Sequence, residues 1–251
     1  MKANRVKEIE EYIISNESVS LDSLCDIFRI SKNTIRRDIN ELVKKGTVKK
    51  VYGGVTAIIK PLIPFEERNI KNNYKKIAIA KAASDFVNDG DVIFIDSGTT
   101  TLNMIDFLKN KNNVTILTNN LNVIVNALPF PNLNVICAGG RLIRKTNSFE
   151  VIHALAILKD YNINKAFMAA TGVSISNGAT NSSSLEYKLK KIIVEKSNEL
   201  FLLVDSSKFD VSALMTYCQL SDIDHLITDK KPAEKYIEFF KENKINFSVS
   251  E

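Results

Sequence analysis

Strand-like and helix-like segments alternate through most of this 251-residue chain, from about residue 74 onward. Short β-branched runs are separated by segments whose apolar residues recur at helical spacing. The predicted strands are Val92–Ile95, Val114–Leu117, Val135–Ala138, Lys165–Ala170, Leu200–Asp205 and Leu226–Thr228. The predicted helices are Tyr74–Val87, Leu102–Leu108, Leu121–Leu128, residues 150–160 and Glu186–Ser197. Such alternation favours an α/β domain with a mostly parallel sheet.

A smaller helical module precedes this domain. Residues 4–15 have the apolar spacing of a helix, and Ser20 and Ser31 are good N-caps for two further short helices. The apolar stripe of the third helix consists of Ile35, Ile39 and Leu42. Gly46 ends that helix, and residues 47–55 have the pattern of a β-hairpin with glycines at its bend. Three short helices followed by such a hairpin are typical of a winged helix-turn-helix.

Positive charge is concentrated in this module. Residues 1–60 hold twelve Lys and Arg against eight Asp and Glu, whereas residues 61–251 are almost balanced. A basic face suits a polyanion, although a charged face also serves solubility alone. Polar side chains off the apolar stripe can meet DNA base edges, and the hairpin lysines are placed for phosphates. The predicted DNA-binding residues are Ser31, Lys32, Asn33, Thr34, Arg36, Arg37, Asn40, Lys49, Lys50 and Tyr52. Asp38 is expected to hold an arginine in place.

Small, polar or charged residues follow five of the predicted strands. In a parallel sheet the carboxyl ends of the strands share one edge, and ligands bind outside it. The segment DSGTTT at 96–101 is the clearest case, because Gly98 lets the backbone turn closely and a helix N-terminus favours an anion. The predicted pocket residues are Asp96, Ser97, Gly98, Thr99, Thr100, Thr101, Thr118, Asn119, Gly139, Gly140, Arg141, Thr171, Gly172 and Lys208.

The DSGTTT segment predicts a phosphate cradle that Lys208 would complete as a cation. The alternatives are an ordinary N-cap with a hydroxyl-rich first turn and a solvent-exposed lysine. Neither a Walker loop nor a GxGxxG pattern is present here, so ATP, NAD and other cofactors are not expected. Two histidines and the lack of a CxxC pair argue against a metal site.

The prolines at 61 and 64 mark the boundary between the two parts. The predicted organisation is a winged helix-turn-helix domain at 1–58, a linker at 59–73 and an α/β effector-binding domain at 74–251. There is no run of eighteen apolar residues and no apolar signal core, so neither a membrane span nor secretion is expected. Three well-separated cysteines fit a reducing compartment, and a cytoplasmic location is expected.

The third helix and hairpin, TIRRDINELVKKG followed by VKKVYGGV, resemble the N-terminal module of the DeoR-type transcriptional regulators. The segments DGDVIFIDSGTTT, LTNN, AGGRL, KAFMAATGVS, LVDSSKF and DIDHLITD resemble the effector domain of the same family, in the same order. Three positions depart from the family pattern. Lys50 and Tyr52 stand where the family usually has arginine and histidine, and Val151 stands near a common glycine, where its side chain would narrow or reshape the pocket.

The resemblance implies a fold like that of ribose-5-phosphate isomerase and a regulator whose operator binding responds to a phosphorylated sugar. It also implies Lys76, Glu186 and Lys190 as further pocket residues. A repressor of a sugar or sugar-phosphate operon is therefore expected, rather than an enzyme. A single winged module buries little surface, so a homodimer or higher homo-oligomer is expected on paired half-sites.

Two other functions stay open at this point. One is a sugar-phosphate isomerase with a DNA-binding appendage, for which Asp96, Asp205 and Glu186 would be candidate acids and bases. The other is a ligand-insensitive DNA-binding protein whose second domain only dimerises. The polar strand ends argue against that reading, because an interface would favour apolar and aromatic residues there.

Overall fold

The computed structural model describes residues 2–16, 18–58, 63–151, 158 and 160–250. The chain divides into two compact units, Met1–Pro61 and Leu62–Glu251. Helix α4 (Phe65–Ile70) falls inside the segment predicted as a linker and belongs to the second unit, where Phe65 is buried in the core. Each unit has its own core.

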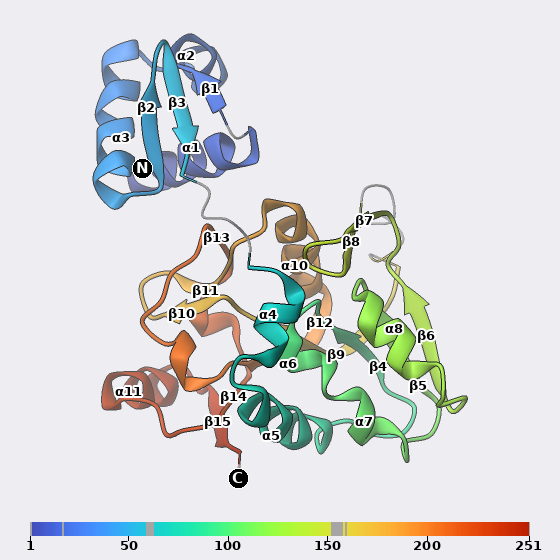
Figure 1. Ribbon diagram of the computed structural model, residues 1–251. Helices are drawn as coiled ribbons and strands as arrows, with labels where there is room; N and C mark the ends of the chain where they lie inside the picture. Colours follow the sequence, from blue (N-terminus) through green and yellow to red (C-terminus); the bar gives the residue numbers. More distant parts are fainter. Residues whose placement is uncertain (1, 17, 59–62, 152–157, 159, 251) are drawn as a thin grey trace. The chain divides into compact units, whose positions relative to one another are not determined.

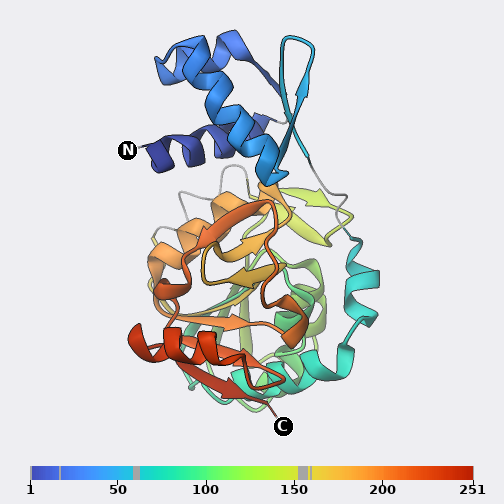
Figure 2. The ribbon, with the colours of Figure 1, turned by 90° about the vertical axis from the view of Figure 1, so that its left-hand side faces the viewer.

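The first unit is a winged helix-turn-helix, as predicted (Figure 1). Its elements are α1 (Lys2–Asn16), β1 (Ser18–Ser20), α2 (Leu21–Phe28), α3 (Lys32–Lys45), β2 (Val48–Val51) and β3 (Gly54–Ala57). The predicted hairpin is β2–β3, and it extends beside α3 in Figure 2. Strand β1 was not predicted from the sequence; it pairs antiparallel with β3 and completes a small sheet in the order β1-β3-β2.

The capping signals of the sequence act as expected. The Ser20 side chain accepts the Ser23 amide at 3.0 Å at the start of α2, and Ser31 caps α3 in the same way. Gly46 ends α3 in the left-handed region at φ 78°. The predicted stripe on α3 is fully buried, because it packs against α1 and α2. Asp38 holds an arginine, as expected, and its partner is Arg5 of α1, whose Nε donates to Oδ2 at 2.8 Å.

The second unit is built on a parallel sheet, which confirms the predicted α/β class (Figure 1). Among the described residues, seven parallel strands stand in the order β15-β14-β12-β9-β4-β5-β6. They are β4 (Val92–Ile95), β5 (Val114–Thr118), β6 (Leu133–Cys137), β9 (Ile163–Ala169), β12 (Ser197–Leu203), β14 (His225–Thr228) and β15 (Asn246–Val249). The chain runs outward from β4 through β5 and β6, and then returns to the other side of β4. The strand order therefore reverses between β4 and β9.

Apolar residues of the strands point alternately into two cores. On one face lie α5 (Asn73–Ser84), α7 (Ile105–Leu108) and α8 (Leu121–Ala127), which share a core with Ile93 and Ile95. On the other face lie α10 (Ser184–Lys196) and α11 (Glu234–Glu242), which share a core with Phe94. A sheet buried on both faces explains why its strands are continuous apolar runs.

The predicted helix Leu102–Leu108 is wrong in its bounds, because the structure has two short helices there. Helix α6 (Thr99–Leu102) begins earlier, directly after Gly98, and α7 follows it. Between them the amides of Asn103 and Met104 bond three residues back, to Thr100 and Thr101, which tightens the chain. The predicted helix at 150–160 lies largely outside the described residues.

Several elements gave no signal in the sequence. One is an antiparallel sheet of β10 (Gly172–Ser174), β11 (Gly178–Asn181) and β13 (Met215–Cys218). Another is a hairpin of β7 (Arg141–Ile143) and β8 (Ser148–Glu150). Their strands are too short for an alternating pattern to stand out. The last strand β15 and helix α11 were also not predicted.

Gly54 allows the close approach of β1 and β3. A Cβ atom at this position would lie 2.4 Å from the Val19 carbonyl oxygen. Gly54→Ala is therefore expected to lower the free energy of unfolding of the first unit by about 2 kcal/mol, the usual effect of overpacking. Urea unfolding followed by circular dichroism measures it. Val51→Ala, on the exposed residue paired with Gly54, is the control and should cost less than about 0.5 kcal/mol. Equal effects of the two substitutions would contradict the close approach.

Candidate functional site

One candidate site is the exposed face of α3. Its buried side carries the predicted stripe and Asp38, and Asn33, Arg36, Arg37 and Asn40 are all exposed. Residues on a helix are 100° apart, so Asn33 and Arg37 lie opposite the buried side and point directly outward. Arg36 lies on the flank of the helix. The two adjacent arginines therefore face different surroundings.

A groove of about 200 Å³ runs between α3 and the β2–β3 hairpin. Arg36 and Asn40 line it from the helix, Lys50 lines it from β2, and Gly53 and Gly54 form part of its wall. Arg36 and Lys50 thus converge on one space from two elements. Such a pair of cations beside small residues is suited to a single phosphate of a nucleic acid backbone.

The remaining residues predicted for DNA binding have varied positions. Ser31 and Thr34 form the N-terminal turn of α3, with their hydroxyls 3.0 Å apart. Lys32 forms an ion pair with Asp22 at 2.5 Å, and both side chains are exposed. Lys49 is exposed on β2, and Tyr52 is fully exposed in the turn of the hairpin.

The other candidate site lies where the strand order reverses, at the carboxyl ends of β4 and β9. Asp96 follows β4, and its Oδ2 accepts the backbone amide of Ala169 on β9 at 3.0 Å. The same oxygen forms an ion pair with Lys190 of α10, and both side chains are almost completely buried. Lys190 also donates to the Ala169 carbonyl at 3.0 Å, as does the hydroxyl of Tyr217. Burial raises the pKa of Tyr217 well above its ordinary value, and the charge of Asp96 adds to this.

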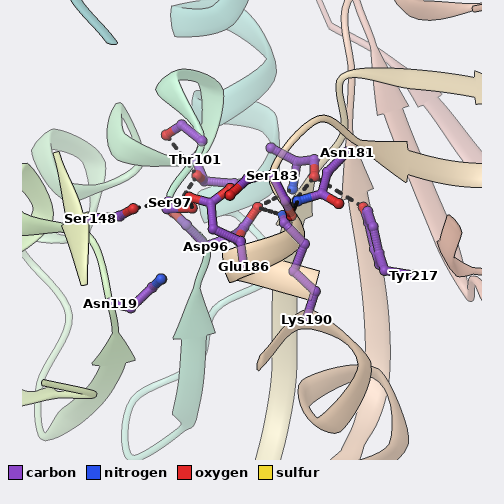
Figure 3. Close-up of polar contacts among 12 residues, drawn as sticks. Asp96, Ser97, Thr101, Asn119, Ser148, Asn181, Ser183, Glu186, Lys190 and Tyr217 are labelled. Carbon is purple, nitrogen blue, oxygen red and sulfur yellow. Dashed lines mark hydrogen bonds and ion pairs between the residues drawn. The ribbon is translucent and has the colours of Figure 1, made fainter. Parts of the chain in front are cut away.

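Glu186, one turn before Lys190 on α10, accepts hydrogen bonds from two serine hydroxyl groups (Figure 3). Its Oε1 accepts a hydrogen bond from Ser97 at 2.8 Å and another from Ser148 at 3.0 Å. In Figure 3 these two serines lie on one side of the carboxylates, and Asn181 and Tyr217 lie on the other.

Two buried amide oxygens near this group have no hydrogen-bond partner among the residues that the structure describes. They are Oδ1 of Asn119, after β5, and Oδ1 of Asn181, on β11. Each side chain is fixed by its amide nitrogen, which donates to Phe149 O at 3.1 Å and to Ser183 O at 3.0 Å respectively. Buried acceptors of this kind are normally paired, so they are suited to hydroxyl donors of a ligand or to water.

Cations gather at the same edge of the sheet. They are Arg68 of α4, Lys71 after it, Lys76 of α5 and Lys208 after β12, and we call them the cation cluster. Burial lowers the pKa of Lys76 to about 8, with a further lowering by the charges of Lys208, Arg68 and Lys71, against an opposing effect of Asp205. Burial likewise lowers the pKa of Lys208, and Lys71 and Arg68 add to it. Burial also lowers the pKa of the Arg68 guanidinium, against the opposing charges of Glu186 and Asp96.

Helix α6 packs beside both α4 and α5, so the DSGTTT segment lies next to the cation cluster. Its side chains differ in role. The Thr101 hydroxyl donates to the carbonyls of Asp96 and Gly98, which fixes the turn. Thr99 and Thr100 are nearly buried. A Cβ on Gly98 would lie 2.3 Å from the Cβ of Ala169, so this glycine permits close packing of α6 on β9.

Other predicted pocket residues have structural partners. The Thr118 hydroxyl donates to Ile95 O at 2.7 Å. Arg141 pairs with Glu150 across the β7–β8 hairpin, and a Cβ on Gly140 would lie 2.0 Å from Glu150 O. Gly172 approaches the backbone of Val211 closely. Gly139 and Thr171 lie at the ends of β6 and β9, and Val151 is buried in the core beside α10.

Several residues of this site were missed by sequence reasoning. They are Arg68, Lys71, Ser148, Asn181 and Tyr217. None follows a strand of the main sheet, which was the signal used. Lys76, Glu186 and Lys190 entered only through the family resemblance. Within the described part of the chain, no group of three or more His, Cys, Asp or Glu is arranged to hold a metal ion. None of the described helices is long and apolar enough to span a membrane.

Comparisons with known proteins match both units. A family model described as the DeoR-like helix-turn-helix domain matches residues 5–60, and one described as the DeoR C-terminal sensor domain matches residues 71–230. The HTH-type transcriptional regulator IolR of Bacillus subtilis is 48% identical over the full length of both chains. The glycerol-3-phosphate regulon repressor of Escherichia coli is 26% identical over 99% of each chain.

Among solved structures, ribose 5-phosphate isomerase A from Methanocaldococcus jannaschii is similar to part of the chain. The match covers 55% of each chain at 22% identity, with a TM-score of 0.41.

The buried pair of Asp96 and Lys190 generates a stability prediction. Lys190→Met leaves the Asp96 carboxylate buried without its cation, which is expected to lower the free energy of unfolding of the second unit by about 3 kcal/mol. Adding Asp96→Asn removes the stranded charge and should recover at least half of that loss. Urea unfolding of the three proteins measures both effects. Additive losses in the double variant would show that the two charges do not act as a pair.

Proposed function

The chain belongs to the DeoR family of transcriptional regulators, and we propose that it is a repressor whose operator binding responds to a phosphorylated sugar held in the second unit. The observation that carries this proposal is the cation cluster beside the polar group of Asp96, Ser97 and Glu186. One end of the pocket is suited to an anion and the other to hydroxyl groups.

The cation cluster supports the proposal that one end of the pocket binds an anion. Like charges held close together and partly out of water cost free energy, and the lowered pKa values of Lys76 and Lys208 reflect this cost. A bound phosphate offsets it, because a dianion pairs with several cations at once. The backbone amides of Ser97–Thr100 and the hydroxyls of Thr99 and Thr100 in the neighbouring DSGTTT segment add donors on the same side.

The other end of the proposed pocket is suited to ligand hydroxyl groups because hydrogen-bond acceptors line it. Glu186 already accepts two serine hydroxyls, and on either side lie the amide oxygens of Asn119 and Asn181, which have no partner within the described part of the chain. A ligand with several hydroxyls supplies the missing donors, whereas an apolar ligand leaves the oxygens unpaired. The name of the Escherichia coli relative, which refers to glycerol 3-phosphate, fits a small phosphorylated polyol.

The first unit supplies the DNA contacts. A single winged module buries too little surface for strong specificity, so we propose a homodimer or higher oligomer on paired half-sites. We assign Arg37 and Asn33 to base edges because they point directly away from the core of the unit. We assign Arg36 and Lys50 to a phosphate because they share the groove beside the hairpin.

A sugar-phosphate isomerase is the competing function. Its acid and base would come from Asp96, Asp205 or Glu186. Asp96 is committed to Lys190 and to the Ala169 amide, and Asp205 accepts from Ser207, which favours a sensing role. Turnover of ribose 5-phosphate to ribulose 5-phosphate by the purified chain would favour the enzyme instead.

The two arginines of α3 give distinct predictions. Arg37→Ala is expected to cost about 1–3 kcal/mol on the preferred duplex and to relax preference at one base pair, because a base contact is lost. Arg36→Ala is expected to weaken all duplexes alike and to reduce the salt slope of log K by about 1, because one phosphate contact is lost. Fluorescence anisotropy from 50 to 200 mM salt, with duplexes selected from a random pool, measures both.

Lys44→Ala is the control for this experiment, since Lys44 is exposed on α3 but lies one turn past Asn40 and outside the groove. It should change specificity less than Arg37→Ala does. If Arg36→Ala alters sequence preference while Arg37→Ala does not, the assignment of the two arginines is reversed.

Thermal shifts of the full chain test the proposed effector. The panel pairs glycerol 3-phosphate, ribose 5-phosphate and fructose 6-phosphate with glycerol, ribose and fructose. A phosphorylated ligand at a hundred times its dissociation constant adds about 2.7 kcal/mol, which raises Tm by roughly 5–10 °C. The free sugars should give no shift. Equal shifts from both sets would contradict the anion end of the pocket.

The pKa of Lys76 adds a pH test of the same site. Lys76 carries its charge below pH 8 and loses it above, so phosphate affinity should fall between pH 8 and pH 9 by up to about tenfold, the limit for one linked proton. Lys76→Arg keeps the charge throughout and should remove this fall. A phosphate affinity that declines equally in both proteins would place the anion away from Lys76.

A further inference from the structure

The β7–β8 hairpin, residues 141–150, joins the proposed pocket to α4. It is a two-stranded sheet that is separate from the seven-stranded one among the described residues, and its register pairs Leu142 with Phe149. An isolated pair of strands is only marginally stable. Its position therefore depends on contacts with neighbouring segments, which include backbone bonds from the Phe149 amide to Asn119 O at 2.8 Å and from the Leu121 amide to Asn147 O at 2.9 Å.

One contact of the hairpin is with Glu186 in the proposed pocket. The buried Ser148 hydroxyl donates to Glu186 Oε1 at 3.0 Å, and Ser97 donates to the same oxygen at 2.8 Å. Two donors already occupy this oxygen, so a ligand hydroxyl that binds Oε1, rather than Oε2, competes with them. The longer bond, from Ser148, is the one that yields more easily.

A second contact joins the turn of the hairpin to the start of α4. Lys145 O accepts the Phe65 amide at 2.9 Å, and the Asn147 side chain donates to Glu66 Oε1 at 3.0 Å. Asn147 adopts φ 48°, a left-handed conformation that places its carbonyl toward the Leu121 amide. Phe65 and Glu66 are the first two residues of α4, and they directly follow the segment that leads from the first unit.

We propose that the β7–β8 hairpin transmits effector binding from Glu186 to α4, and through α4 to the segment that carries the DNA-binding unit. Release of Ser148 removes the bond of the hairpin to Glu186. Ser148 directly follows the turn that holds Lys145 and Asn147, so its displacement alters their contacts with α4. Such coupling requires two arrangements of the hairpin, one with and one without the bond from Ser148 to Glu186. This inference rests on the proposed effector pocket, since the ligand acts by competing for Glu186.

Ser148→Ala tests the coupling without any ligand. Loss of a hydrogen bond to a charged group should speed amide exchange about tenfold at Phe65, whose amide bonds to the hairpin, and at Leu121. Ser197→Ala is the control, because the Ser197 hydroxyl donates to Ile193 O at 2.5 Å at the end of α10, outside the hairpin and the proposed pocket. It should change exchange at Phe65 less than twofold. Hydrogen exchange of the full chain, read by mass spectrometry or NMR, gives both rates.

Asn147→Gly tests the contact of the hairpin turn with α4, since glycine keeps the left-handed backbone while the side-chain amide is lost. It should speed exchange in α4 while leaving the amides of α10 unchanged. Glu66→Gln keeps an acceptor for Asn147 and should behave like the wild-type chain, unlike Glu66→Ala.

Measurements of DNA affinity test whether the hairpin influences DNA binding. Ser148→Ala should change the affinity for a duplex selected by the wild-type chain at least threefold, although the substitution lies outside the first unit, and Ser197→Ala should not. Unchanged exchange at Phe65 in Ser148→Ala, or unchanged DNA affinity, overturns the proposal. Neither readout uses a sugar phosphate, so a failed ligand panel would be distinguished from a failed coupling.

Discussion

The ion pair of Asp96 and Lys190 is the contact on which the second unit depends. It stands where the order of the strands reverses, and it connects β4 to β9 through the Ala169 amide and to α10 through Lys190. A buried charge pair is retained only when its remaining hydrogen-bonding groups are satisfied. Here the Ala169 carbonyl and the Tyr217 ring complete the surroundings of the lysine. The position of α10, and with it that of Glu186, follows from this pair.

The surroundings of Glu186 give the proposed pocket two chemically different ends. Glu186 and Asp96 attract hydroxyl donors and oppose the lowering of the pKa of Arg68. The cation cluster comes from α4, from α5 and from the end of β12, which reach the same sheet edge from the other side. A ligand with an anionic group and several hydroxyls matches both ends, and this match is the physical basis of the proposed effector class.

Different contacts position the functional elements of the two units. In the first unit the pair of Arg5 and Asp38 ties α1 to α3, and Gly54 lets β1 lie against β3. These contacts fix the buried side of α3 and leave its polar side exposed for the proposed contacts with DNA. In the second unit buried polar contacts lie at the strand ends, and the turn end of the β7–β8 hairpin is held by polar contacts with α4 and Glu186. An element held in this way is easily biased by a ligand.

The sequence by itself determined the elements whose signals are local. Ser20, Ser31 and Gly46 mark helix ends because capping is satisfied within a few residues, and the apolar stripe on α3 shows which side is buried. The parallel sheet followed from apolar runs separated by helices, and the strand ends pointed to Asp96 and Asn119. Only the tertiary structure decided the strand order, the pairing of Asp96 with Lys190, and the meeting of Ser97 with Ser148 on Glu186. Those partners are separated by 38 to 94 residues, so no local pattern links them, and their contacts depend on how the strands are arranged.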